Sequence, residues 1–297
     1  MHHGLWTAAA SYIIWGLFPL YFHQLSNVTS LEIVAHRSVW SLVFVAGVLA
    51  VQQRWAWLRE ALRQPKVLGT YAAAALLLSS NWLIYVWAVN HGHVLEASLG
   101  YFINPLVNVL LGVLVLHERP RKLQWLALGV AGAGVVWMAL AMGTPPWVAL
   151  ALALSFGFYG LIKKMAPLGS LEGLSLETLL LAPIAVPALL WLTLHSPDGG
   201  HSPSTWAWLL VAGPLTAIPL LLFGFGAQRV SMGTLGLLQY LAPSLQFLLG
   251  WMVFQEPLSP QRLMGFGLIW LALLLYSVDS VRQWPKAQTR PKSLSAK

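Results

Sequence analysis

The chain has 297 residues, of which 58% are hydrophobic and 9% are charged, whereas soluble domains carry roughly 25% charged residues. This balance excludes a soluble enzyme, a disordered protein and a coiled coil, because too few polar groups remain to cover a water-exposed surface. The net charge of +8 would favour a nucleic-acid partner in a soluble protein, but in a membrane protein the positions of the charges matter more than their sum. The composition therefore predicts a polytopic membrane protein without a nucleic-acid partner.

Ten hydrophobic stretches follow one another along the chain, and each is long enough to cross a hydrocarbon core of about 30 Å as an α-helix. None alternates in the way that transmembrane strands do, so the predicted fold is an all-α polytopic membrane protein with ten transmembrane helices. The first stretch lacks the basic start and the late cleavage site of a signal peptide, and it is therefore counted as a helix. The predicted helices cover residues 5–23, 31–52, 67–90, 95–117, 122–142, 146–163, 173–194, 205–227, 232–254 and 262–280.

Basic residues lie almost entirely on one side of these predicted helices. With both termini in the cytoplasm, fifteen of the 17 lysines and arginines fall in inner loops or in the C-terminal tail, among them Lys163 and Lys164. Cytoplasmic loops are enriched in Lys and Arg, so the sequence predicts a multi-pass protein of the cell membrane, surrounded by lipids, with cytoplasmic N- and C-termini. The tail 282–297 is basic and lacks apolar periodicity, which predicts a disordered segment along the inner leaflet.

The chain contains an internal repeat. Pro105 and Pro243 are separated by 138 residues, and the same offset aligns their surroundings without a gap. Residues 1–142 and 143–281 therefore form two predicted five-helix repeats, and the odd number of helices inverts the second repeat relative to the first. Inverted repeats are typical of secondary transporters, which hold the substrate at the repeat interface. A duplication without mechanistic meaning is the alternative.

Polar side chains follow one face of the fourth predicted helix and recur in the ninth. Asn104 and Asn108 are one turn apart, and Pro105 between them removes a backbone hydrogen bond, which can kink the helix. We expect two broken or bent helices that present amide and phenol groups to a central cavity, whereas hydrogen bonding between helices is the alternative. The predicted substrate-binding residues are Asn81, Tyr85, Tyr101, Asn104, Asn108, Gln239, Tyr240 and Gln246, with Pro105 and Pro243 shaping the gates.

Aromatic and cationic side chains extend this predicted site. Most tryptophans lie near the membrane interfaces, where tryptophan anchors a helix, but Trp15, Trp40 and Trp82 are candidates for the cavity wall. The second helix carries His36 and Arg37. An arginine inside a span faces protein or water, or extends to the interface. Two roles for Arg37 remain open: it binds an anionic solute, or it pairs with Glu32 or Glu96.

The sequence gives little support to catalysis, so no catalytic residue, metal site or cofactor is predicted. His91 and His93 form a loop pair without further ligands, which argues against a metal site. The alternative function, a membrane-embedded enzyme acting on a lipid-linked substrate, requires convergent acid, base or metal groups. No carboxylate lies at a helix midpoint, and the amides and phenols favour an uncharged or zwitterionic small organic solute over a proton relay.

Gly129, Gly132 and Gly134 permit close packing within the chain and also allow a homodimer.

Several motifs resemble those of a known family. They are His36–Ser41, Asn81-Trp82-Leu83, Leu95–Leu106, Phe158–Leu161, and Thr234-Leu235-Gly236 followed by Gln239-Tyr240 and Pro243. These motifs are similar to the RarD family of EamA-type transporters, in the drug/metabolite transporter superfamily, and the resemblance covers roughly residues 5–280. It implies a bacterial inner-membrane permease or exporter with ten helices in two inverted halves around a central cavity. Catalytic residues are not part of what it implies, and it supplies no firm substrate.

Overall fold

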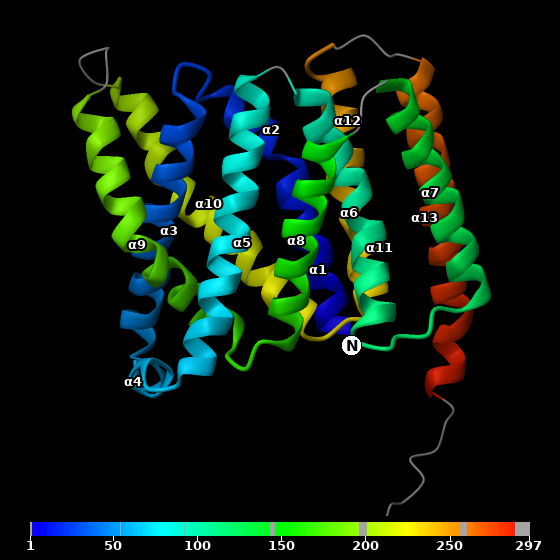
Figure 1. Cartoon of the computed structure of the whole chain (residues 1–297), viewed down its shortest axis with the longest axis horizontal. Helices are drawn as coiled ribbons and strands as arrows, with labels where there is room; N and C mark the ends of the chain where they lie inside the picture. Colours follow the sequence, from blue (N-terminus) through cyan, green and yellow to red (C-terminus); the bar gives the residue numbers. More distant parts are fainter. Residues whose placement is uncertain are drawn as a thin grey trace, which may run out of the picture. The chain divides into compact units, whose positions relative to one another are not determined.

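The structure is a computed structural model that describes residues 2–53, 55–91, 93–142, 146–195, 201–255 and 260–288. Within these ranges the chain forms helices and no strands, which confirms the all-α prediction (Figure 1). Gly92, the start of the predicted second repeat at 143–145 and the tail residues 289–297 lie outside the described residues. The helices are α1 (His2–Gly16), α2 (Phe18–His23), α3 (Ser30–Gln52), α4 (Ala56–Leu62), α5 (Pro65–Asn90), α6 (Val94–Leu114), α7 (Lys122–Met142), α8 (Trp147–Met165), α9 (Ser170–Leu194), α10 (Pro203–Ala227), α11 (Met232–Gln239), α12 (Leu241–Met252) and α13 (Pro260–Gln288).

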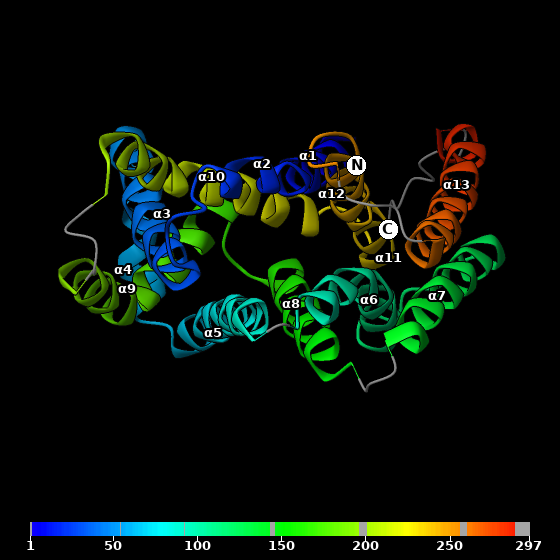
Figure 2. The same ribbon diagram turned by 90° about the horizontal axis from the view of Figure 1, so that it is seen from above.

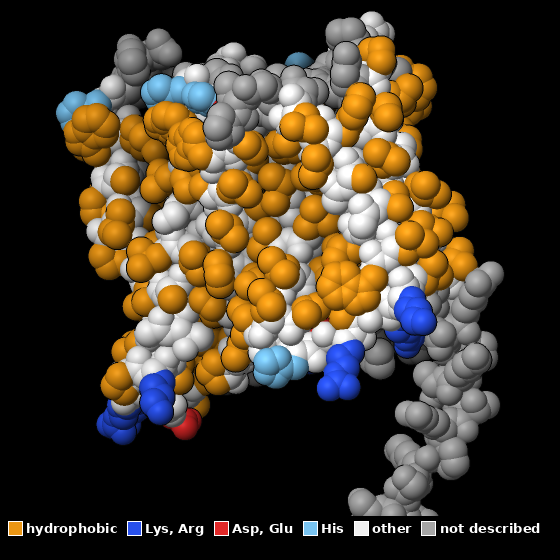
Figure 3. Space-filling model, turned by 45° about the vertical axis from the view of Figure 1, so that its right-hand side comes forward, with side chains coloured by type: hydrophobic (Ala, Val, Ile, Leu, Met, Phe, Trp, Pro, Cys, Tyr) orange, Lys and Arg blue, Asp and Glu red, His pale blue; other side chains and the backbone are white. Residues whose placement is uncertain are grey.

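Eight helical segments of the described residues are long and apolar enough to cross a membrane. They are His3–His23, which combines α1 and α2, Ser30–Gln52, Pro65–Ala88, Glu96–Leu114, Lys122–Leu140, Trp147–Met165, Ser170–Leu194 and Pro203–Ala227. α13 contributes a shorter apolar stretch, Leu263–Tyr276. Hydrophobic side chains cover most of the face shown in Figure 3, and large ones such as Ile184 and Leu194 are exposed. The chain is therefore a multi-pass membrane protein.

Two of the predicted helices are each divided into two shorter helices. The positions of the breaks do not coincide with the positions of the prolines. The first predicted helix breaks at Leu17 between α1 and α2, and the ninth breaks at Tyr240 between α11 and α12. Pro19 and Pro243 lie in the first turns of α2 and α12, where a missing N–H removes no helical hydrogen bond. α6, by contrast, is continuous through Pro105, so of the two expected forms, broken or bent, the fourth helix is not broken.

Two further segments differ from the predicted boundaries. α4 is a short helix in a connection for which no helix was predicted. α13 continues to Gln288, so the first seven residues of the predicted tail are helical.

The chain folds as two compact units, of which the first comprises residues 1–118 and 146–257. Figure 2 shows that its helices form two rows, with α1, α2, α10, α11 and α12 in one row and α5, α6 and α8 in the other. α3 and α9 lie together beside α5 and α10. The second unit comprises residues 119–145 and 258–297, in which α7 packs against α13. A Cβ at Gly134 would lie 3.2 Å from the carbonyl oxygen of Gly265, whereas Gly129 and Gly132 have no such neighbour within 4 Å.

The helix boundaries recur along the chain with the offset of the sequence repeat. α5 and α6 begin at Pro65 and Val94, and α10 and α11 begin at Pro203 and Met232, in both cases 138 residues later. The segments after α6 and α12 also match. His117 and Gln255, again 138 residues apart, both have a φ of 54°, a left-handed conformation that residues other than glycine rarely adopt.

Several basic residues of the first unit come together at one end of its helices. Lys164 at the end of α8 donates to the carbonyl oxygens of Ala227, the last residue of α10, and of Val230. Gly4 at the start of α1 packs against Arg229. Figure 1 shows α4 and the N-terminus at this same lower end. α4 carries Arg59.

Candidate functional site

A cavity of about 190 Å³ lies inside the first unit, between its two rows of helices. Its wall combines side chains from α1, α2, α3, α5, α6, α8, α10, α11 and α12, so residues that are far apart in sequence meet around it. Ten of the fifteen residues predicted for the site or its gates line this cavity: Trp15, Arg37, Asn81, Trp82, Tyr85, Tyr101, Asn104, Gln239, Pro243 and Gln246. Aromatic side chains that were not predicted complete the wall: Tyr12, Phe18, Phe22 and Phe156.

The other five predicted residues lie behind the wall or away from it. Trp40 donates through Nε1 to Nδ1 of His36 at 2.9 Å, so these two residues bond to each other. Tyr240 is buried at the break between α11 and α12. Pro105 contributes its carbonyl oxygen to the crossing of α6 and α11. Asn108 is buried at the same crossing, one turn beyond the wall residue Asn104.

A chain of amides connects α8, α6 and α11 beside the cavity. Asn104 donates through Nδ2 to the carbonyl oxygen of Ala153 at 2.9 Å. Asn108 donates through Nδ2 to Oδ1 of Asn104 at 3.1 Å and to Oε1 of Gln239 at 2.9 Å. A Cβ at Gly236 would lie 2.6 Å from the carbonyl oxygen of Pro105, so glycine is what allows α11 to approach α6 this closely. The amides thus fix the position of two cavity-lining side chains.

A second amide ties α5 to α8. Asn81 donates through Nδ2 to the carbonyl oxygen of Leu152 and to Oγ of Ser155, both at 2.9 Å. Gln246 on the other side of the cavity donates to the carbonyl oxygen of Trp15 at 3.2 Å. Since these side chains line the cavity while bonding to backbone, both predicted roles of the amides, as cavity lining and as helix contacts, occur together.

Tyr12 lines the cavity, but its hydroxyl group is buried without a hydrogen-bond partner among the described residues. The Tyr12 side chain is 1% exposed. A buried hydroxyl without a partner costs roughly 1–3 kcal/mol.

Aromatic rings close the cavity beyond Tyr12. The ring of Phe223 lies 6.1 Å from that of Tyr12, 5.6 Å from that of Trp15 and 5.5 Å from that of Phe156, measured between centroids. Tyr159 then stacks on the far side at 5.9 Å with an interplanar angle of 11°. These five side chains, called the aromatic layer below, separate the cavity from the C-terminal end of α8.

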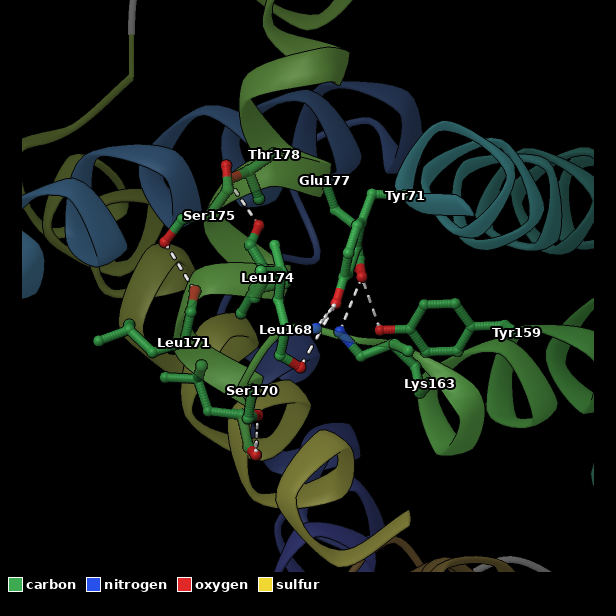
Figure 4. A network of polar contacts seen from close by, with 12 residues as sticks. Tyr71, Tyr159, Lys163, Leu168, Ser170, Leu171, Leu174, Ser175, Glu177 and Thr178 are labelled. Carbon is green, nitrogen blue, oxygen red and sulfur yellow. Dashed lines mark hydrogen bonds and ion pairs between the residues drawn. The ribbon is translucent and has the colours of Figure 1, made fainter. Parts of the chain in front are cut away.

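A buried ion pair lies directly beyond the aromatic layer, and sequence reasoning missed it (Figure 4). Lys163 is 2% exposed, and its Nζ lies 2.7 Å from Oε1 of Glu177, which is 1% exposed. Tyr159 donates to the other carboxylate oxygen at 3.3 Å. The sequence prediction placed Lys163 among the basic residues of an inner loop, whereas in the structure it lies in the last turns of α8 and is buried. The signal was a glutamate inside the hydrophobic start of α9, because buried carboxylates are retained only with a partner.

Arg37 reaches the cavity wall from α3 and contacts one hydroxyl and three rings. Its Nε donates to Oγ1 of Thr216 at 2.9 Å. Its guanidinium carbon lies 4.6 Å from the ring centroid of Trp82, 5.4 Å from that of Phe18 and 5.8 Å from that of Phe22. Such distances suit cation–π attraction. These ring contacts stabilise the guanidinium in the cavity wall, where the other described lining residues carry no formal charge.

The two carboxylates that were considered as partners of Arg37 bond elsewhere. Oε1 of Glu32 lies 2.8 Å from Nε2 of His201, and Oε1 of Glu96 lies 2.8 Å from Nδ1 of His93. Of the two roles left open by the sequence, structural pairing with these glutamates is not what the structure shows. Among the described residues there is also no cluster of three metal-ligating side chains.

Comparisons with known proteins agree with this architecture. The sequence model of the EamA-like transporter family matches residues 2–140 and again residues 145–278. The protein RarD of Streptomyces exfoliatus is 46% identical over 289 residues, which cover 97% of this chain and 92% of that protein. An uncharacterized transporter of Bacillus subtilis is 46% identical over 96% of both chains, and RarD of Escherichia coli is 39% identical over 94% of this chain and 95% of its own.

A solved crystal structure is similar in fold. It has a TM-score of 0.71 and 20% sequence identity, and the match covers 93% of this chain and 97% of that chain. At this identity the similarity concerns the fold alone. The extent of the family match and the identity to its members establish that the chain belongs to the EamA-like transporter family.

Proposed function

We propose that the chain is a secondary transporter, a permease or exporter that moves a small organic solute by alternating access around the cavity between the two rows of helices. The observation that carries this proposal is a cavity with mostly aromatic walls and a few fixed amides, inside a membrane protein whose relatives are named transporters. Such walls suit a partly apolar solute. The volume is smaller than the roughly 300–1,000 Å³ typical of sites for drug-sized ligands, so we expect a compact metabolite.

The proposal includes ten membrane spans in two inverted five-helix repeats, with α11 and α12 forming one span together. The matching helix starts and the two matches of the family model support this organisation. A contact between equivalent positions supports it further. The hydroxyl of Tyr240 donates to the carbonyl oxygen of Phe102 at 3.1 Å, and these residues are 138 positions apart. Equivalent positions of two symmetry-related halves meet near their common axis, where transporters bind substrate.

The aromatic layer and the Lys163–Glu177 pair form the closed inner gate in this proposal. Both lie between the cavity and the end of the first unit where basic residues gather, and cytoplasmic ends of membrane proteins carry such residues. Opening toward the cytoplasm would separate rings and an ion pair that are now buried.

The same basic end supports a bacterial inner-membrane location with cytoplasmic N- and C-termini, and lipids as the surrounding partners. A Cβ added at Gly129 or Gly132 would meet no atom of the described residues within 4 Å, which leaves room for a second copy in a homodimer. The proposed mechanism needs neither nucleic acid nor a cofactor.

Alternating access can be tested without knowing the solute, because the chain contains no cysteine and a single introduced thiol is unique. Ala242 lines the cavity and is 7% exposed, and cysteine there changes little volume. We expect Ala242→Cys to react with a membrane-impermeant methanethiosulfonate reagent added to either side of oriented vesicles. Ala188→Cys, on an exposed position of α9 that faces lipid in this proposal, is the matched control and is expected to react from neither side.

The pattern of labelling separates the alternatives. Labelling of Ala242→Cys from one side alone would indicate a one-sided pocket, as in an embedded enzyme, and would contradict alternating access. Labelling from neither side would indicate a membrane scaffold without an accessible cavity.

A further inference from the structure

We infer that Arg37 is the anion-binding group of the cavity and that the solute is a small organic monocarboxylate whose apolar part lies against the aromatic wall. This inference rests on the proposed transport function and names the solute class for the same cavity. It replaces the expectation, drawn from the scarcity of carboxylates in the spans, that the solute is uncharged or zwitterionic.

The hydrogen-bonding capacity of Arg37 leaves room for such a ligand. A guanidinium has five N–H donors, and Thr216 accepts from Nε at 2.9 Å. Among the described residues, the guanidinium makes no further hydrogen bond. Arg37 is half-buried and lines the cavity, and the inference places the edge formed by its two Nη groups toward the bound solute. Two parallel N–H groups on that edge match the two oxygens of a carboxylate.

The charge of Arg37 also calls for a partner. A cation inside a span is retained when it pairs with an anion or faces water, and the described residues that line this cavity include no Asp or Glu. The rings of Trp82, Phe18 and Phe22 attract the cation but do not neutralise it. A bound anion supplies the missing negative charge within the cavity.

The surroundings favour a carboxylate over a phosphate ester. A phosphate dianion is bound by several cations or by a cluster of backbone N–H groups, and here a single arginine lies among aromatic rings. The aromatic side chains of Trp82, Phe18 and Phe22 around the guanidinium favour an apolar or aromatic carbon skeleton.

Matched pairs of carboxylates and amides test this assignment in the purified full-length protein. The probes are benzoate with benzamide, 3-phenylpropanoate with 3-phenylpropanamide, and hexanoate with hexanamide, measured by titration calorimetry. For at least one pair we expect the wild type to bind the carboxylate at least tenfold more tightly than the amide. Arg37→Gln is expected to weaken carboxylate binding roughly 10- to 150-fold, because hydrogen bonds to charged groups contribute about 1.5–3 kcal/mol, and to change amide binding less than threefold.

A second variant keeps the test valid if Arg37→Gln fails to fold. Arg37→Lys keeps the positive charge but loses the planar guanidinium, whose paired N–H groups bind both oxygens of a carboxylate. It is therefore expected to show an intermediate carboxylate affinity and an unchanged amide affinity. A wild type that binds no carboxylate of the panel, or variants that bind both members of every pair as the wild type does, would overturn the assignment.

Flux of the same probes into proteoliposomes separates this inference from the proposed function. Carboxylate-selective binding that depends on Arg37, without any flux, would overturn the transporter and leave the anion site intact. Flux of carboxylates that Arg37→Gln leaves unchanged would overturn the anion site and leave the transporter intact.

Discussion

Replacing Lys163 by methionine is expected to destabilise the protein by about 3–5 kcal/mol. Methionine fills much of the same space but leaves the Glu177 carboxylate, which is 1% exposed, without the cation that lies 2.7 Å away. The hydroxyl of Tyr159 at 3.3 Å supplies one hydrogen bond and no charge. The loss is measured as the change in free energy of unfolding of the purified protein in detergent, followed by circular dichroism during denaturant titration.

Lys164→Met is the matched control, because Lys164 is the next residue on α8 and donates to backbone carbonyl oxygens rather than to a carboxylate. Its loss is expected to cost about 1.5–3 kcal/mol, because the hydrogen bonds of a charged donor are lost but no buried charge is left without a partner. Equal stability of the two variants would contradict a buried ion pair. The double variant Lys163→Met with Glu177→Leu is expected to recover most of the stability, because apolar pairs often replace buried ion pairs without loss.

This double variant also tests the inner gate apart from stability. If the ion pair holds the gate closed, its removal shifts the protein toward the inward-open state. In the double variant, Ala242→Cys is then expected to react faster with reagent from the cytoplasmic side than it does with the pair intact. An unchanged rate would mean that the pair stabilises the fold without gating it.

Replacing Asn108 by leucine is expected to cost about 1–3 kcal/mol of stability for each carbonyl that loses its donor, namely Oδ1 of Asn104 and Oε1 of Gln239. Part of this cost is offset, because the Asn108 Oδ1 that leucine removes is itself buried without a hydrogen-bond partner among the described residues. Both amides that lose their donor line the cavity, so flux is also expected to fall sharply in protein that still folds.

Gln246→Leu is the companion variant for transport. Gln246 lines the cavity, and its side chain donates to the carbonyl oxygen of Trp15, so its loss is expected to reduce flux with a smaller loss of stability than Asn108→Leu. Stability is followed by unfolding titration and flux by uptake into proteoliposomes. Unchanged transport kinetics in both variants would show that these amides serve helix packing alone.

The sequence predicted the helical fold well because hydrophobic runs of about 20 residues have few alternatives to transmembrane helices. It did not predict where helices break. Pro105 and Pro243 occupy equivalent positions, yet α6 is continuous whereas the break before Pro243 falls at Tyr240. A proline does not by itself fix where a helix breaks, and a single sequence carries no direct record of the packing around it.

The candidate site was predictable where polar residues repeat at helical spacing, as with Asn104, and where both repeats carry amides, as with Gln239. The spacing could not distinguish residues of the cavity wall from those at the helix crossing behind it, where Asn108 lies. The Lys163–Glu177 pair joins the end of α8 to the start of α9. Its lysine looked like one more basic loop residue, because the positive-inside rule counts charges without regard to burial.

The measurement that tests the transporter most directly is solute flux in proteoliposomes, with and without a pH gradient, across a panel of small carboxylates, zwitterions and uncharged amides. We predict saturable uptake of at least one carboxylate that depends on the protein, is inhibited by other members of its class and is lost in Asn108→Leu. Absence of saturable flux for every solute of the panel from folded protein would contradict the account, and turnover of a lipid-linked substrate by the same preparation would replace it with an enzyme.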